Sequence, residues 1–298
     1  MLRRLLVTCC LLAWSGVAHA GDVDSLASRT AIDLSLTLSQ NSYSNNWVGG
    51  DAGNLAWIAL GSVTRQDYLG PAWHWRNTLN LGYGQTHSQD PDTKRWQRPR
   101  KSTDKIDFES LMRYLRFAAF PPYASVRAIS QFEDATFVNH KLYVNPIQLT
   151  EAAGLSRQLY KAGDDELLTR AGFGLRQLIQ RSFDDTTNFD KTSTATSTDG
   201  GVEWVTDASY KIPGSSIGYK GKLTTFKALY YSKSKDLRGK PNANYWKAID
   251  VNWENTFSAQ VSKYIVVSLN LQWLYDKDID LGGRFKQTLS IGLAWKNL

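Results

Sequence analysis

The chain has 298 residues and a formal net charge of +7, and both of its cysteines, Cys9 and Cys10, lie near the N-terminus. Removing an N-terminal segment that contains Arg3 and Arg4 leaves +5, far from the strongly basic balance of a nucleic-acid-binding domain. We therefore expect no nucleic-acid partner. Beyond Cys10 the chain offers no thiol, so disulfides and thiolate metal sites are excluded there.

Residues 1–20 have the pattern of a cleavable export signal. The two arginines form a charged start, Leu5 to Val17 is an apolar core, and Ala18-His19-Ala20 is a small-x-small cleavage site. The apolar run is shorter than the roughly 20 residues that a membrane-spanning helix needs. We predict a signal peptide at 1–20 and a mature, exported domain at 21–298.

Alternation of apolar and polar residues with a period of two runs through the mature chain, which is typical of β-strands. In residues 31–39, for example, Ile32 and three leucines face one way while Asp33, two serines and a threonine face the other. The pattern predicts twelve strands, at 31–39, about 53–67, 73–83, 106–114, about 122–134, about 147–160, 166–179, 202–211, about 216–232 with a bulge near Thr225, 249–261, 265–275 and 288–295.

The predicted connections alternate between tight turns and long polar segments. The long ones are 41–52, 87–103, 135–146, 184–199 and 233–245, and within them the Thr/Ser-rich run 186–198 is expected to be a mobile loop. Long–short alternation is typical of outer-membrane barrels. We predict an all-β fold, a transmembrane antiparallel up-and-down β-barrel of about twelve strands, in the outer membrane of a Gram-negative bacterium with both termini in the periplasm.

A soluble antiparallel barrel or sandwich would show similar alternation. Against it, the apolar face is rich in Trp and Tyr, and the polar face carries charges that would cost on the order of several kcal/mol each if buried dry and unpaired. A water-filled lumen removes that cost. The charged residues predicted to face the lumen are Arg76, Arg113, Arg170, Arg176, Glu203, Asp250 and Glu254.

A second group of charges lies in the long segment 87–103, beside Trp96. On an extracellular loop these cations would contact lipopolysaccharide phosphates or attract anionic solutes, and the alternative is an ordinary solvated loop. The candidates are Lys94, Arg95, Arg98, Arg100 and Lys101.

Catalytic and metal-binding motifs are weak. Gly214 to Gly218 matches G-x-S-x-G, but that motif needs a strand-to-helix turn, and we expect a plain turn between strands. Asp276 to Gly282 resembles a calcium loop, but Gln287 stands where a bidentate Glu is required, so a solvated acidic loop is expected. His74, His87 and His140 have no matching serine motif. We predict no enzymatic activity, no cofactor and no metal.

Several ordered motifs resemble a family of uncharacterised outer-membrane barrels of unknown function. They are Ser44 to Gly50 with the pattern S-N-x-W-x-G-G, Leu79 to Gly84, Lys101 to Ile106, Tyr275 to Asp278, and Gly292 to Trp295. The resemblance implies a barrel and no specific activity. The last strand also resembles the signal read by the barrel-assembly machinery, although the chain ends in Leu298 rather than an aromatic residue.

Two functions remain open from the sequence. One is a narrow, porin-like channel or uptake barrel for small polar solutes. The alternative is a non-conducting structural or interaction barrel. In either case the expected partners are outer-membrane lipid and lipopolysaccharide, with the barrel-assembly machinery and periplasmic chaperones during biogenesis.

Overall fold

The computed structural model describes residues 28–43, 52–117, 119–137, 139–185, 187 and 189–297, and the side chains of 294–297 are outside this description. The predicted signal peptide at 1–20 and the Ser44–Gly50 motif therefore lie outside the described residues. None of the helical segments within these ranges has the length and apolarity needed to traverse a bilayer.

The described elements are fourteen strands and one short 3-10 turn. In chain order they are β1 (Arg29–Asn41), β2 (Asn54–Leu69), β3 (Trp73–Ser88), β4 (Arg100–Tyr114), β5 (Pro122–Ser130), β6 (Glu133–Phe137), β7 (His140–Tyr143), β8 (Ile147–Ala162), β9 (Asp165–Phe183), β10 (Thr192–Lys211), β11 (Ile217–Tyr231), η3 (Tyr245–Lys247), β12 (Ile249–Gln260), β13 (Ile265–Tyr275) and β14 (Arg284–Asn297).

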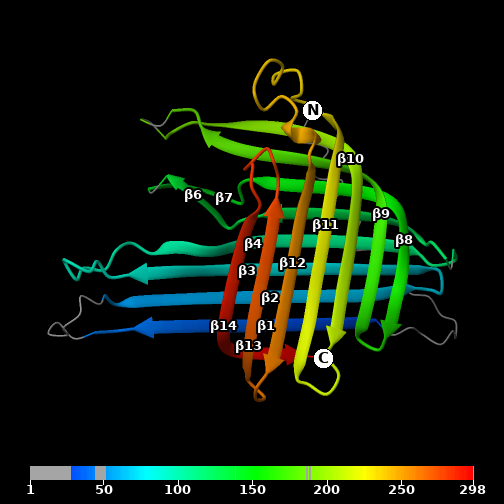
Figure 1. The fold of residues 1–298 in the computed structure, drawn as a ribbon, viewed down its shortest axis with the longest axis horizontal. Coiled ribbons are helices and arrows are strands. Elements are labelled where there is room, and N and C mark those ends of the chain that lie inside the picture. The colour runs from blue at the N-terminus through cyan, green and yellow to red at the C-terminus, as the bar shows by residue number, and fades with distance from the viewer. Residues whose placement is uncertain are drawn as a thin grey trace.

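Twelve of these strands form a closed antiparallel barrel, which confirms the predicted fold class. The ring runs β1-β14-β13-β12-β11-β10-β9-β8-β5-β4-β3-β2, and β6 pairs with β7 in a separate hairpin. In Figure 1 the strands at the front, β11 to β14, cross β1 to β4 behind them at a steep angle, as strand tilt in a barrel requires. The seam between β1 and β14 runs from Ile32–Asn297 to Thr37–Gly292.

The two ends of the barrel differ in the length of their connections. At one end, called the short-turn end, segments such as 70–72 and 163–164 join adjacent strands. At the other, called the long-loop end, lie 89–99, 232–248 and the β6–β7 hairpin. The first residues of β1 and the last residues of β14 both lie at the short-turn end, because Ile32 pairs with Asn297.

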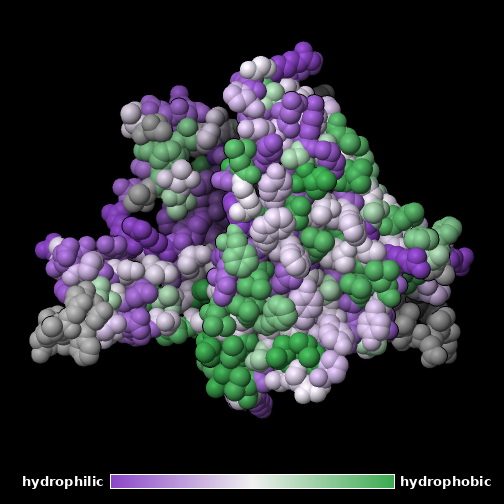
Figure 2. Space-filling model, viewed as in Figure 1, coloured by the Kyte–Doolittle hydropathy of each residue, from purple (hydrophilic) through white to green (hydrophobic). Residues whose placement is uncertain are grey.

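Polar and apolar side chains are distributed in the reverse of the way usual in a soluble protein, with many charged residues buried and many large apolar residues exposed. Buried positions include Asp107, Glu109 and Arg170, which is 2% exposed, whereas Leu289 on β14 is 65% exposed. The outward residues of β1 and β14 are successive leucines and isoleucines, and Figure 2 shows apolar side chains gathered over the lower parts of β13 and β14, with hydrophilic ones toward the long-loop end. An outer wall of this kind is stable only where an apolar phase covers it.

Two sequence predictions about the strands were wrong. The segment 192–199 belongs to β10 instead of a mobile loop, and it pairs with β9 from Thr192–Phe183 to Asp199–Arg176. Its threonines are β-branched and suit a pleated ribbon, which polarity alone conceals. The bulge predicted near Thr225 lies instead at Leu229, because Gly200 pairs with Tyr230 and Gly201 with Ala228.

The sequence did not predict the β6–β7 hairpin. Its residues were assigned to the end of a strand at about 122–134 and to the long connection at 135–146. It is attached to β4 by Asp104, whose carboxylate accepts the backbone N–H groups of Phe132 at 2.5 Å and Glu133 at 3.1 Å. Lys101 donates to the same carboxylate at 2.9 Å and to the side chain of Gln131 at 2.9 Å. A buried charged anchor therefore holds the hairpin at the rim of the barrel.

Candidate functional site

The lumen is the candidate site, because polar side chains from nearly every strand converge there. Period-two geometry turns alternate residues inward, and the contacts across the barrel identify that face. The structure places all seven residues predicted to face the lumen on it: Arg76 on β3, Arg113 on β4, Arg170 and Arg176 on β9, Glu203 on β10, and Asp250 and Glu254 on β12.

Three cations and three anions form a central cluster, here called the Asp207 cluster. Arg76 lies 3.2 Å from Glu166 and 3.3 Å from Asp207, so it reaches from β3 to both β9 and β10. Lys222 lies 2.6 Å from Glu109 and 3.5 Å from Asp207. The members are Arg76, Arg170, Lys222, Glu109, Glu166 and Asp207, with Arg170 paired to Glu109 and 3.7 Å from Asp207.

Because the formal charges of the Asp207 cluster cancel, it can remain ionised out of water. Each carboxylate has at least two cationic neighbours, which offsets part of the desolvation cost of burying it. Such a cluster cross-links β3, β4, β9, β10 and β11 from inside and fills the lumen between them.

A second connection crosses the full width of the barrel. Lys105 on β4 lies 2.9 Å from Glu254 on β12, and these two strands are six places apart in the ring of twelve. Lys105 is also 3.2 Å from Asp107, which receives a two-point hydrogen bond from Arg127 at 2.8 and 2.9 Å. We call the Lys105–Glu254 pair the crossbar.

A third group lies on the β9, β10 and β12 walls. Arg176 donates to Asp199 at 2.9 Å from Nε and lies 2.8 Å from Asp250. The guanidinium also stacks over the ring of Phe226 at 4.4 Å. Glu203 is buried on β10, in register with Gly172 and Phe226.

The opposite wall of the lumen is different in character. The inward positions of β1, β2, β12, β13 and β14 are mostly small hydroxyl and amide residues that are partly exposed. They bond to one another, as Thr256 does to Asn270 and Ser62 to Asn80, each at 2.8 Å. The set is Ser35, Thr37, Ser62, Thr64, Thr256, Ser258, Ser268, Asn270, Thr288 and Ser290. The lumen thus has one packed, charged wall and one small, wettable wall.

The cations predicted at the rim differ in their surroundings: four lie in the β3–β4 loop or at the exposed start of β4, and one is held by neighbouring side chains. Lys94 and Arg95 lie in the β3–β4 loop, and Arg98 donates to Asn139 at 2.8 Å. Arg100 is exposed at the start of β4. Lys101 is instead held by Asp104 and Gln131, so its assignment as an open, phosphate-facing loop cation was wrong.

Several members of the lumen network were not predicted from the sequence. Arg127 and Lys222 lie on β5 and β11, the strands whose two faces the alternation left ambiguous. Asp107, Glu109, Glu166 and Asp207 alternate with apolar residues in the sequence, which was the signal available for them. Lys105 offers no such signal because it precedes the clear part of the β4 pattern.

The remaining motifs take simple structural roles. Gly214 to Gly218 runs from a turn into β11 and joins two strands, with Ser215 Oγ donating to the carbonyl of Ile212 at 2.9 Å. In the 276–282 loop, Asp276 and Asp280 accept backbone N–H groups of their own loop at 2.9 and 2.8 Å. Across the part of the chain that the structure describes, no group of three or more His, Cys, Asp or Glu residues is arranged to hold a metal.

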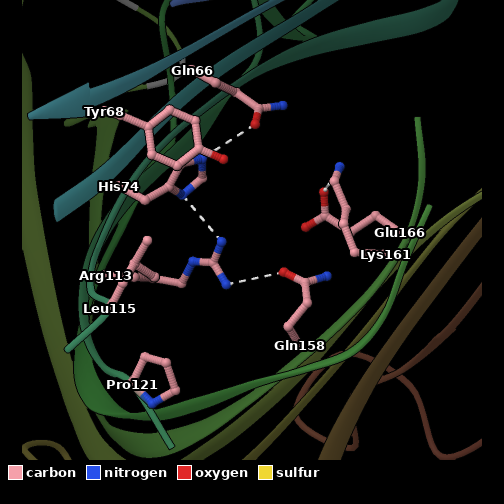
Figure 3. Close-up of a pocket in the computed structure, with 9 residues that line it drawn as sticks. All are labelled: Gln66, Tyr68, His74, Arg113, Leu115, Pro121, Gln158, Lys161 and Glu166. Atoms are coloured by element: carbon pink, nitrogen blue, oxygen red, sulfur yellow. Dashed lines mark hydrogen bonds and ion pairs between the residues drawn. The ribbon is translucent and has the colours of Figure 1, made fainter. Parts of the chain in front are cut away.

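A cavity of about 260 Å³ lies at the short-turn end of the barrel. Figure 3 shows Arg113 and His74 on one side of it and Glu166 and Lys161 on the other. His74 is buried, accepts from Arg113 at 3.2 Å through Nδ1, and lies 3.2 Å from Gln66 Oε1 through Nε2. The arrangement suits the neutral Nε2–H tautomer of His74.

Comparison with known proteins gives one family match. Residues 38–135 match the family model described as Protein of unknown function (DUF3078). This range contains three of the motifs on which the resemblance rests, Ser44 to Gly50, Leu79 to Gly84 and Lys101 to Ile106, and the resemblance to a family of unknown function is thereby confirmed over it. No curated protein matches the chain at a significant level.

Among solved structures, the chain is similar to the translocator domain of the autotransporter NalP from Neisseria meningitidis, at 10% identity and a TM-score of 0.36 over 98% of this chain and 93% of that one. It is also similar to the COG4313 outer membrane channel from Pseudomonas putida F1, at 12% identity and a TM-score of 0.38 over 94% and 99%. A third is Pseudomonas putida OprB, at 10% identity and a TM-score of 0.29 over 91% and 94%.

Proposed function

We propose that this chain is an outer-membrane β-barrel of a Gram-negative bacterium. Its inverted polarity supports this, because a closed barrel with an apolar outer wall and a polar interior suits a bilayer and does not suit water. Under this proposal the long-loop end is extracellular and the short-turn end periplasmic, and the predicted signal at 1–20 directs export.

We propose further that the barrel is a narrow channel for water, ions and small polar solutes, without catalytic activity. The observation that carries this is the asymmetry of the lumen: the small, partly exposed wall of β1, β2 and β12 to β14 lies beside the packed Asp207 cluster. Small hydroxyl residues leave space and offer hydrogen bonds to a hydrated solute, while fixed charges on the other wall set selectivity.

The alternative is a non-conducting barrel, and one observation favours it. The crossbar joins opposite walls, so two side chains occupy the middle of the lumen. A barrel braced in this way would serve as a structural or interaction element of the envelope, contacting lipid and lipopolysaccharide through its outer wall and rim.

Single-channel recording separates the two functions. The exported barrel would be purified in detergent, its folding verified by heat-dependent gel mobility, and then inserted into a planar bilayer. Discrete, reproducible conductance steps support the channel. A correctly folded barrel that gives no steps, alone and with the crossbar removed, overturns the channel and leaves the structural alternative.

A further inference from the structure

Arg113 is a buried cation without a partner of opposite charge among the described residues. Its guanidinium donates from Nη1 to the side-chain oxygen of Gln158 and from Nη2 to Nδ1 of His74, each at 3.2 Å. Both acceptors are neutral, since His74 can accept at Nδ1 only when that nitrogen carries no proton. Arg113 is 6% exposed, and its Nε atom has no hydrogen-bond partner.

The carboxylate that could serve Arg113 is already engaged. Glu166 lines the same cavity, but one of its oxygens pairs with Arg76 and the other with Lys161, each at 3.2 Å. Figure 3 shows the terminal nitrogens of Arg113 facing open space, with Glu166 and Lys161 across it. The Nη1 and Nη2 atoms each carry two hydrogens, and each has one protein acceptor within the described ranges. The edge of the guanidinium can therefore still donate toward the cavity.

A buried charge left unpaired is costly, so the positive charge of Arg113 favours an anion in the cavity beside it. The cavity of about 260 Å³ is several times the roughly 30 Å³ that one liquid water occupies. Its lining also contains Tyr68, Leu115 and Pro121, which offer apolar contact. A planar carboxylate fits the two-point edge of a guanidinium, and an organic body fits the apolar lining.

We propose that the cavity at the short-turn end binds a small organic carboxylate, with the carboxylate on the Nη1–Nη2 edge of Arg113 and Lys161 as a second cation. The binding does not require the barrel to conduct, so the proposal is independent of the channel. Lys161 lines the same cavity, and its side chain is 46% exposed.

The test uses benzoate as the probe, on the purified barrel in detergent. Calorimetric titration and the midpoint of thermal unfolding would be measured with sodium benzoate, sodium phosphate and sodium chloride at equal ionic strength. We expect benzoate alone to raise the midpoint in a saturable way. Arg113→Met should weaken benzoate binding about tenfold or more, because it removes a charge-assisted two-point hydrogen bond.

Arg65→Met is the matched control, because Arg65 is an exposed cation near the same end and lies 2.8 Å from Asp67. We expect it to leave benzoate binding unchanged. If Arg113→Met does not fold, Arg113→Lys replaces it and should still bind at least severalfold more weakly than the native barrel. No benzoate-specific shift, an equal shift with phosphate, or equal binding by the native barrel and the Arg113 variant would each overturn the proposal.

Discussion

The Nζ atom of Lys105 lies 2.9 Å from Oε2 of Glu254, although the two residues belong to strands on opposite sides of the barrel. Their side chains thus span the lumen, and any solute that crosses the barrel passes beside them. If the lumen conducts, Glu254→Gln should leave Lys105 with Asp107 alone, which it shares with Arg127, and shift selectivity toward anions. Lys105→Met should shift selectivity toward cations. Reversal potentials in a salt gradient measure both shifts.

The double variant Lys105→Ala/Glu254→Ala removes both arms of the crossbar without changing net charge. We expect larger single-channel conductance with little change in selectivity. Ser258→Ala, on the small wall of the same β12 strand, is the control and should change conductance little. Unchanged conductance in the double variant would show that the crossbar is not the narrowest point.

Removing the charge of the two buried arginines, Arg170 and Arg113, should have different effects on the stability of the barrel. Arg170→Met leaves Glu109 and Asp207 short of a cation, and we expect a loss on the order of 3 kcal/mol in the free energy of unfolding. Arg113→Met removes a charge that has no anion among the described residues, so stability should be unchanged or raised. Urea unfolding in lipid vesicles compares the variants, and an equal loss in both would contradict the assignment of their surroundings.

The outward face of β1 provides a test of the bilayer itself. Leu36 lies near the middle of β1 and is 52% exposed, whereas the neighbouring Ser35 faces the lumen. Leu36→Arg should cost about 2–4 kcal/mol in folding into vesicles, because a charge would face lipid near the midplane. Ser35→Arg, one residue away, should cost much less because its side chain enters water. Equal costs for the two variants would argue against a lipid-covered outer wall.

Gly154 and Gly172 are paired across β8 and β9 at a point where the two backbones come very close. A Cβ atom at Gly172 would collide with the carbonyl oxygen of Ala153, and backbone cannot move aside as a side chain can. Gly172→Ala should therefore destabilise the barrel by roughly 1–3 kcal/mol. At Gly218 the nearest atom would be Ser258 Oγ at an ordinary 3.5 Å, so Gly218→Ala should be nearly neutral in the same unfolding assay.

Asp104 should control the order of the β6–β7 hairpin. Its replacement by Ala removes an acceptor from the backbone N–H groups of Phe132 and Glu133, together with the partner of Lys101. Local opening of residues 131–145 should become easier by about 1.5–3 kcal/mol, the range for hydrogen bonds to a charged group. Amide hydrogen exchange measures it, with exposed Asp92→Ala as the control, and unchanged protection of the hairpin would show that other contacts hold it.

The barrel itself was predictable because each strand carries its own evidence. Leu34, Leu36 and Leu38 alternate with polar residues, and this local pattern predicts which face of the strand is the apolar outer one and which faces the lumen. The alternation of long and short connections between the predicted strands then indicates an up-and-down barrel of twelve strands. Along β5 and β11, polar and apolar residues occur on both faces. The strands could therefore be predicted there, but the inward-facing side chains could not.

The pairings inside the lumen were not predictable in this way. Glu109 meets Lys222 because β4 and β11 face one another across the barrel, a relation set by tilt and register rather than by neighbours in sequence. Lys101 illustrates the same limit at the rim. In the sequence it belongs to a run of cations. Only the fold brings Gln131, just before the β6–β7 hairpin, and the carbonyl of Glu133, at the start of it, to Lys101 as partners.

The seam between β1 and β14 has a consequence for the timing of assembly. It joins the first and last strands of the described chain, so the ring cannot close until the C-terminal strand has been made and delivered. Until then β1 presents an unpaired edge, and a row of free backbone N–H and C=O groups readily recruits other chains. Such long-range closure is slow. The interval between synthesis of β1 and arrival of β14 is therefore the period in which this chain most needs an escort that shields strand edges.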